Sequence, residues 1–366
     1  ELTTWEKVGR GGEEYGCGVW VPVTMCMVCS LPIVGSIRRC LVRLKGSLGK
    51  VPLGEVRKHI RALATETPSP VPGSLNLQIN FLKGPSIPLS VPHPNGLPPL
   101  PHGGALGATL RLLGVGNFCG LLSALLGEQK ILILCPDDCK RGMVCEVLLC
   151  LLYPLSWSWP CIPILPKGMI EFVQAPVPYV LGLRSATRDV MEHVGKDVIV
   201  YDINRRGFAK NHQPGGMPND LGAAVMKCWE DWVADVESGG NDNGNDNGRE
   251  EYKINYTDKE KKRERRFRVG ISLELSKYIN STGEVLSSKV AGRDLEFALQ
   301  FAGTQMFSNF AEKVEDDSAV FFHDLMDLGE ISTGRDRTVN AGAAVLEEYE
   351  RRIENWKMPK VEDEDE

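Results

Sequence analysis

Short runs of almost entirely apolar residues constrain the fold of this chain more than any other feature. Residues 130–135 read KILILC, residues 179–183 read YVLGL, and residues 198–202 read VIVYD. Segments with helical spacing of apolar residues, such as 143–152, lie between these runs. Strands that are apolar on both faces are typical of parallel sheets, which are covered on both sides. The pattern predicts an α/β domain over residues 105–207, with a parallel sheet and helices on both faces.

The chain changes in character on either side of residues 105–207. Residues 16–45 predict a strand, a break at Pro32 and a helix with Val34, Ile37, Cys40, Leu41 and Leu44 on one face. We therefore expect an upstream lobe over 1–66. Residues 67–104 are dense in proline and glycine and predict a semi-extended connection, in which 75–82 is a candidate strand.

A helical region is expected over residues 208–357, with helices at about 271–280, 294–314 and 342–357. The low-complexity stretch around GGNDNGNDNG predicts a disordered insertion at 238–250, and the charged end predicts an acidic tail at 358–366.

Composition excludes several classes of protein. A chain of 366 residues is long enough for two or three lobes, and its net charge of −6 argues against a dedicated nucleic-acid binder. Many of its eleven cysteines sit in apolar runs, which is typical of buried thiols in a reducing compartment. The longest apolar run, 112–127, is shorter than the roughly 20 residues of a bilayer span. We expect a cytoplasmic protein.

Two short motifs admit a chemical and a structural interpretation. Gly114-x-Gly116-x-x-x-Gly120 opens a helix, and Pro136-Asp137-Asp138 follows the next strand, which loosely matches a dinucleotide site. Small packing residues at a helix start explain the glycines equally well. Cys26-x-x-Cys29 has the spacing of metal ligands, but no second pair accompanies it, so core thiols remain the alternative.

No motif for covalent catalysis is present in the sequence. GxSxG, HExxH and GxxxxGK[ST] are all missing, and the six histidines have no acid or nucleophile pattern around them. We therefore expect no catalytic residue, cofactor or metal. Seven of the ten residues in 259–268 are basic, which indicates either a peripheral membrane contact or a solvated helix face.

An ordered series of motifs runs through residues 121–184. In chain order they are Glu128, Leu152-x-Pro154, Trp157, Ile162-Pro163-x-Leu165-Pro166, Ala175-Pro176-x-Pro178 and Gly182-Leu183. The series closely resembles the central part of DENN domains, and the strand that ends at Asp202 fits the same pattern. Weaker similarity extends upstream to Val21-Pro22 and 29–32, and downstream to 295–310, where Thr304-Gln305-Met306-Phe307 match best.

The resemblance implies a partial longin-like lobe upstream, a central α/β lobe and a helical region downstream. DENN proteins typically act as guanine nucleotide exchange factors for Rab-family small GTPases. The resemblance therefore implies a regulator of membrane trafficking, cytoplasmic or peripheral on endomembranes, that makes no covalent bond. The alternative is a DENN-like scaffold that binds a GTPase without exchanging its nucleotide. The first strands of the longin-like pattern are not evident, which keeps this alternative open.

Three motif residues are candidate contacts for the partner, namely Glu128, Trp157 and Asp202. For Glu128 a cap-like partner role and an exposed contact both stay open, and for Trp157 core packing is the alternative. The other motif residues are predicted to hold the fold. They are Leu152, Pro154, Pro163, Pro166, Pro176, Gly182, Gln305 and Phe307.

Overall fold

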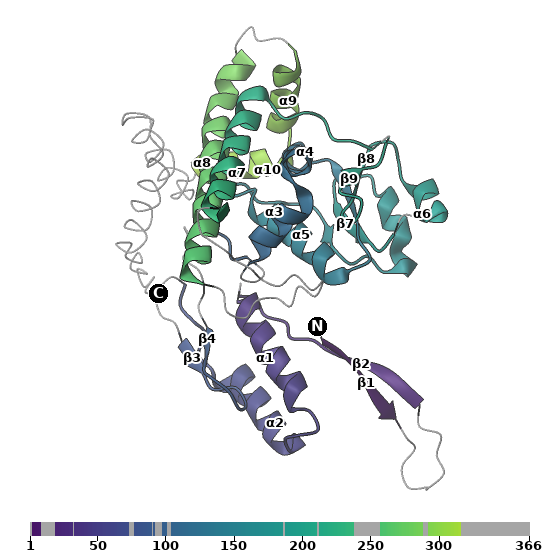
Figure 1. Cartoon of the computed structure of the whole chain (residues 1–366), viewed down its shortest axis with the longest axis vertical. Coiled ribbons are helices and arrows are strands. Elements are labelled where there is room, and N and C mark those ends of the chain that lie inside the picture. Colours follow the sequence, from purple (N-terminus) through teal and green to yellow (C-terminus); the bar gives the residue numbers. More distant parts are fainter. Residues whose placement is uncertain are drawn as a thin grey trace, which may run out of the picture. The chain divides into compact units, whose positions relative to one another are not determined.

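The protein divides into two compact units, Glu1–Pro94 and Asn95–Glu366, each with its own hydrophobic core (Figure 1). The computed structural model describes residues 2–8, 19–31, 33–72, 77–89, 91, 97–100, 104–185, 187–210, 212–237, 257–287 and 292–315. The division between the units falls inside the stretch 67–104 that was predicted to be a connection.

The described residues of the first unit form two pairs of antiparallel strands and two helices. Strand β1 (Leu2–Val8) pairs with β2 (Val19–Met25), and β3 (Leu77–Ile79) pairs with β4 (Ile87–Leu89). Helices α1 (Val34–Ser47) and α2 (Leu53–Arg61) lie between these pairs in the chain, and a π-helical turn, η1 (Ala62–Glu66), follows α2. The predicted strand and helix of residues 16–45 are therefore confirmed, whereas the longin-like assignment stays a prediction.

The core of the first unit includes residues that were expected to belong to the connection. Ile87 of β4 is fully buried against Cys40 and Leu44 of α1, as the helical spacing of α1 predicts. The hydroxyl of Ser36 donates a hydrogen bond of 2.6 Å to the carbonyl oxygen of Pro88. Residues 77–91 are thus packed elements rather than a plain connection, because their alternating apolar side chains find a helix face to cover them.

The second unit contains the predicted parallel sheet. Its five strands have the order β6 (Cys161–Ile162), β7 (Val180–Leu183), β5 (Lys130–Leu134), β8 (Val198–Asp202) and β9 (Gly207–Phe208). The first four strands are mutually parallel. Strand β9 runs antiparallel to β8, which the sequence analysis did not anticipate, because a two-residue strand leaves almost no pattern.

The central strand β5 is buried on both faces. Ile131 and Ile133 join the larger core, which includes residues of α3 (Ala105–Leu113), α4 (Val115–Leu126) and α5 (Asp138–Cys150). Leu132 and Leu134 join the smaller core under the 3₁₀ segment η2 (Lys167–Gln174) and α6 (Arg188–His193). Side chains that alternate between two cores explain why the strand sequences are continuously apolar.

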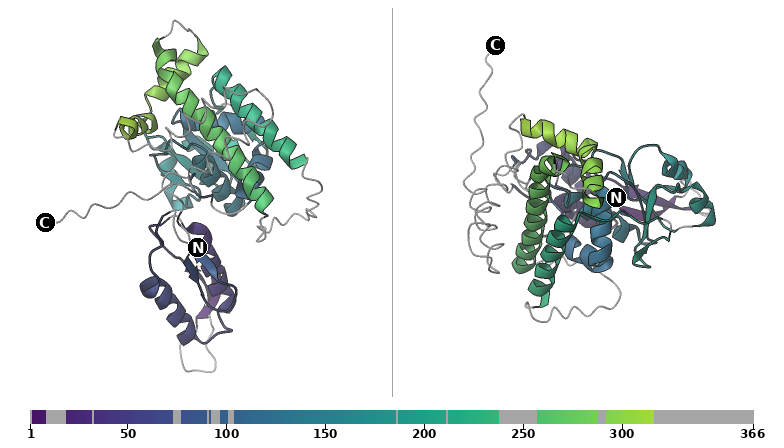
Figure 2. Two further views of the ribbon diagram at one scale, coloured as in Figure 1. Left: turned by 90° about the vertical axis from the view of Figure 1, so that its left-hand side faces the viewer. Right: turned by 90° about the horizontal axis from the view of Figure 1, so that it is seen from above.

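The downstream region of the second unit is helical, as predicted. Helices α7 (Asn219–Glu237) and α8 (Asp258–Ser287) lie side by side, and α9 (Arg293–Ala302) and α10 (Gln305–Glu315) follow (Figures 1 and 2). The predicted helix at 294–314 is therefore two helices, with Gly303 and Thr304 between them. The predicted disordered insertion at 238–250, helix at 342–357 and acidic tail at 358–366 lie outside the described residues.

Helix α8 begins 13 residues before the predicted start at about 271. The hydroxyl oxygen of Thr257 accepts a hydrogen bond of 3.2 Å from the N–H of Glu260, and the Glu260 carboxylate accepts one of 2.8 Å from the N–H of Thr257. This reciprocal capping box starts the helix before the basic run, so the run is part of the helix.

Among the described helices, none alone combines the length and hydropathy of a bilayer span. Helices α3 and α4 satisfy these criteria only as a pair that is bent by 105°.

Replacing Leu132 by alanine is predicted to destabilise the second unit by about 2–5 kcal/mol, because the fully buried side chain leaves a cavity in the smaller core. Urea unfolding measures the change. Leu299→Ala is the control, since Leu299 is 59% exposed and its truncation should change stability by less than ~0.5 kcal/mol. Equal effects of the two substitutions would contradict the buried position of β5.

Candidate interaction surface

Glu128 lies at the amino end of the central sheet, in the turn between α4 and β5. Its backbone has a positive φ of 45°, which directs its side chain toward the start of α10. The carboxylate accepts hydrogen bonds from the N–H groups of Gln305, at 2.9 Å, and Met306, at 2.7 Å. Two family motifs that lie 177 residues apart in the sequence therefore meet. The geometry is that of a helix cap, and a direct contact of Glu128 with a partner stays a prediction.

Thr304 caps the start of helix α10 from within the chain segment that leads into it. The hydroxyl oxygen of Thr304 accepts a hydrogen bond of 3.2 Å from the N–H of Phe307. Glu128 and Thr304 together satisfy three N–H groups that a helix start otherwise leaves without an acceptor. A carboxylate at this position also interacts favourably with the helix dipole.

The neighbouring turn and loop are held to the same helices. The side-chain amide of Gln300 donates a 2.9 Å hydrogen bond to the carbonyl oxygen of Gly127, and that of Asn309 donates one of the same length to the hydroxyl of Ser158. A Cβ on Gly127 would lie 2.8 Å from the amide nitrogen of Gln300, so glycine suits this close approach. Trp157 is half-buried and packs against the larger core, which agrees with the packing interpretation.

Glu128→Ala is predicted to lower the stability of the second unit by about 1–2 kcal/mol, because two N–H groups of α10 lose their acceptor. Thermal unfolding and hydrogen exchange of the Gln305 and Met306 amides measure the effect. Glu171→Ala removes an exposed carboxylate from η2 and serves as the control. An unchanged melting temperature for Glu128→Ala would refute the capping role.

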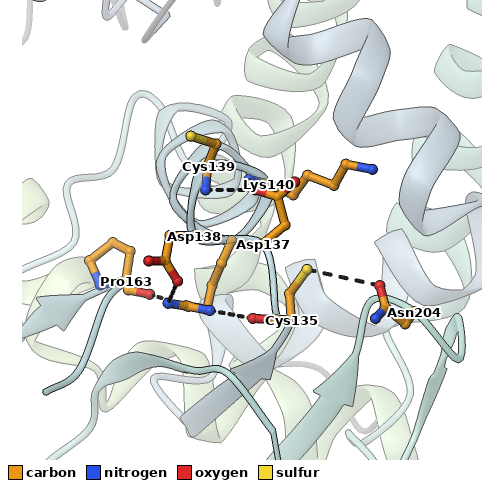
Figure 3. Close-up of polar contacts among 8 residues, drawn as sticks. Cys135, Asp137, Asp138, Cys139, Lys140, Pro163 and Asn204 are labelled. Atoms are coloured by element: carbon orange, nitrogen blue, oxygen red, sulfur yellow. Dashed lines mark hydrogen bonds and ion pairs between the residues drawn. The ribbon is translucent and has the colours of Figure 1, made fainter. Parts of the chain in front are cut away.

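The opposite, carboxyl end of the parallel strands exposes polar segments. Residues 136–139 follow β5, 184–185 follow β7, and 204–206 follow β8, and all of these are exposed. Asp137 caps α5, since its carboxylate accepts hydrogen bonds from the N–H groups of Cys139, at 2.9 Å, and Lys140, at 3.1 Å (Figure 3). In open α/β sheets, ligands and partners commonly meet this edge of the sheet.

Arg141 is buried at the carboxyl end, with only 1% of its surface exposed. Its guanidinium donates 2.6 Å hydrogen bonds to the carbonyl oxygen of Pro163 and to the Asp138 carboxylate, and a further bond to the carbonyl oxygen of Cys135. Figure 3 shows these acceptors converging from different segments. A buried guanidinium requires such compensation, because removing it from water is costly.

Gly182 of β7 completes this cluster. A Cβ at Gly182 would lie 2.5 Å from the Cδ atom of Arg141 and would collide with the carbonyl oxygen of Pro163. The N–H of Leu165 donates a 2.9 Å hydrogen bond to the carbonyl oxygen of Gly182, so the loop lies directly on the strand. The motif residues Pro163 and Gly182 therefore occur together for a steric reason.

Other motif residues occupy structural positions. Leu152 is fully buried, Pro154 follows a cis peptide bond, and Pro166 lies at the start of η2, whereas Pro176 is exposed. The rings of Phe307 and Phe301 pack edge to face at 5.1 Å.

Asp202 ends β8 and organises the turn that follows. Its carboxylate accepts hydrogen bonds from the N–H groups of Asn204, at 2.9 Å, and Arg205, at 3.2 Å. Asp202 therefore lies at the carboxyl end of the sheet, whereas Glu128 lies at the amino end. The three predicted contacts do not form one cluster, and their role toward a partner stays a prediction.

The loose dinucleotide motif lacks its structural context. Gly114 joins α3 to α4, so no strand leads into it. A Cβ at Gly120 would lie 3.0–3.1 Å from Pro214 and Phe208. The glycines serve a helix corner and close packing, as the structural alternative proposed.

The described cysteines are free thiols, and they range from buried through half-buried to exposed. Burial raises the pKa of the Cys161 thiol to about 11 and holds that of Cys145 well above its ordinary value. Cys26 and Cys29 are exposed. Within the described ranges, no three side chains of His, Cys, Asp or Glu gather as a metal site requires.

Iodoacetamide at pH 8 is predicted to modify Cys26, Cys29 and Cys139 before Cys40 and Cys145. The first three thiols are exposed, whereas burial blocks access to the other two and raises their pKa values. Mass spectrometry of peptides from timed reactions measures the order, with urea-unfolded protein as the control. If Cys145 were labelled as fast as Cys139, the burial of Cys145 in the core would be contradicted.

The basic run 259–268 forms the start of α8 and is partly neutralised within the protein. Arg266 pairs with Asp235 at 2.6 Å and Lys261 with Asp258 at 2.7 Å, while Arg268 donates to the carbonyl oxygen of Pro98. Glu264, inside the run, is itself buried. Fewer cations are therefore available to an anionic membrane than the sequence count suggests.

Sequence reasoning missed Arg141, although a signal was present. Arg141, Val144, Cys145 and Leu148 recur at the spacing of one helix face, and all four are buried. A charge on an apolar helix face indicates either an error in the assigned face or a buried, hydrogen-bonded group.

The second unit is an open α/β domain extended by helices. Residues 20–206, just over half of the chain, match the family model of the DENN (AEX-3) domain. The chain belongs to the DENN domain family.

Curated relatives show the same similarity over parts of their length. The chain is 30% identical to DENN domain-containing protein 3 of Mus musculus over 193 residues, which are 50% of this chain and 14% of that protein. It is 29% identical over 119 residues to elicitor of plant defense protein 1 of Fusarium odoratissimum, which covers 32% of this chain and 13% of that protein. The corresponding protein of Gibberella zeae gives 29% identity, with 10% of its length covered. The chain thus matches only a small part of each relative.

Proposed function

We propose that this protein promotes GDP release from a Rab-family small GTPase by stabilising the nucleotide-free state. Membership of the DENN domain family carries the proposal, since that family is typically linked to exchange on Rab GTPases. Cytoplasmic location and peripheral association with endomembranes, including a contact through 259–268, belong to the same proposal.

Such an activity requires a binding surface and no bond-making chemistry. An exchange factor binds the empty GTPase more tightly than the loaded one, and linkage then weakens nucleotide binding by the same factor. Moving a GTPase from 1:99 to 99:1 between these states needs ~5.5 kcal/mol of differential binding. Specific protein interfaces of about 1,200–2,000 Å² can supply free energies of this size.

The carboxyl end of the sheet supports the proposal as the contact surface. The segment that follows β6 starts at this end and crosses to the start of β7. It exposes apolar side chains along its length, with Ile164 at 52%, Met169 at 38% and Phe172 at 45% exposure. Interfaces typically combine an apolar centre with a polar rim. Val173 of η2 is buried and accepts a 2.7 Å hydrogen bond from the Tyr179 hydroxyl, so the segment is anchored.

Purified protein is predicted to accelerate the release of fluorescent GDP from at least one member of a panel of Rab GTPases. Stopped-flow or plate fluorescence with excess unlabelled GTP measures the rate. Absence of acceleration with every member would refute the exchange function, and tight binding without acceleration would favour the scaffold alternative.

A matched pair of variants tests the contact surface in the same assay. Phe172→Ser should reduce exchange, because it removes exposed apolar area from the segment after β6. Leu299→Ser removes a similarly exposed apolar side chain from α9 and should leave exchange unchanged. Equal GDP-release rates for the two variants would show that Phe172 of η2 does not contribute to the contact surface.

A further inference from the structure

Among the described residues, Arg141 is one of the largest fully buried side chains, and its guanidinium is satisfied by oxygen atoms of three residues from two segments. Cys135 lies directly after β5, Asp138 starts α5, and Pro163 lies directly after β6. The side chain of Asp138 is 50% exposed, so the ion pair reaches from the interior to the surface. The guanidinium therefore joins the interior of the domain to the surface at the carboxyl end.

The segments joined by Arg141 are those that expose the candidate surface. Residues 136–139 are exposed on one side of the cluster. On the other side, Pro163 leads directly to Ile164, which is 52% exposed. The planar guanidinium presents its donors in a fixed fork, so its acceptors have one favoured arrangement. A lysine ammonium is a single point charge and cannot hold all three oxygens in that geometry.

We propose that Arg141 is a positioning residue that holds 135–139 and 163–165 in the one arrangement to which the GTPase binds. This inference rests on the proposed function and adds a residue that cannot touch the partner, since only 1% of Arg141 is exposed. A surface that is already ordered loses less entropy on association. Loosening the cluster therefore weakens binding of the GTPase.

Two variants and one control test the inference. Arg141→Lys retains the positive charge and removes the fork, and Asp138→Asn weakens the one charged acceptor at the protein surface. Gly142→Ala is the control, because it adds a methyl group next to Arg141 in the chain, and no atom outside its chain neighbours and the backbone of α5 lies within 4 Å of that methyl. Circular dichroism establishes the folded fraction of each protein.

Kinetics of GDP release separate positioning from simple stability. In Arg141→Lys the half-saturating concentration should rise about tenfold, which corresponds to ~1.4 kcal/mol, with the maximal rate nearly unchanged. A merely structural role would lower the active fraction, and hence the maximal rate, without changing the half-saturating concentration. That result, or wild-type behaviour of the variant, would overturn the inference. Gly142→Ala should match the wild type.

Hydrogen exchange of the free protein gives a second readout that needs no GTPase. Asp138→Asn should raise exchange at Ile164 and Leu165, which Asp138 can influence through Arg141. Unchanged protection there overturns the inference. This variant also decides the question if Arg141→Lys does not fold. If the wild type releases GDP from no panel member, the proposed function fails, whereas the exchange pattern still tests the positioning role.

Discussion

Burial of the central strand β5 between two cores is the constraint on which the second unit depends. Ile131 and Ile133 fill one core while Leu132 and Leu134 fill the other, so no side chain between them can meet water. A polar group within such a strand would require a buried partner. Polar chemistry is therefore displaced to the two ends of the strands, and the domain differs sharply between those ends.

The amino end is used for assembly of the fold. Glu128 and Gly127 bind α10 and α9 through hydrogen bonds of 2.7–2.9 Å, which joins the helical region to the sheet. Contacts of this kind occupy the polar groups that a partner would otherwise use. At the carboxyl end the acceptors are occupied from inside by Arg141, which leaves the outer faces of the turns exposed.

The sequence predicts the α/β lobe because its signals are periodic and local. Strands β5, β7 and β8 and helix α5 follow directly from apolar spacing. Longer-range pairings have no such signal: Glu128 finds its partners at 305–306 only after folding, and the sequence motif alone left its role open. The capping box of Thr257 and Glu260 is local and was readable, yet the helix start was predicted only at about 271. Arg141 was missed because its acceptors are mostly backbone carbonyls, which have no residue signature.

An exchange factor makes a particular demand on such a domain. It must bind the GTPase tightly as well as favour its empty state. A surface that is already ordered loses less entropy on association, so it binds the GTPase more tightly. The buried sheet is stiff because interiors are close-packed, and the Arg141 cluster transmits that stiffness to turns that lie outside the core. In this family member, the rigidity of the interior and the activity we propose for the surface therefore have the same physical origin.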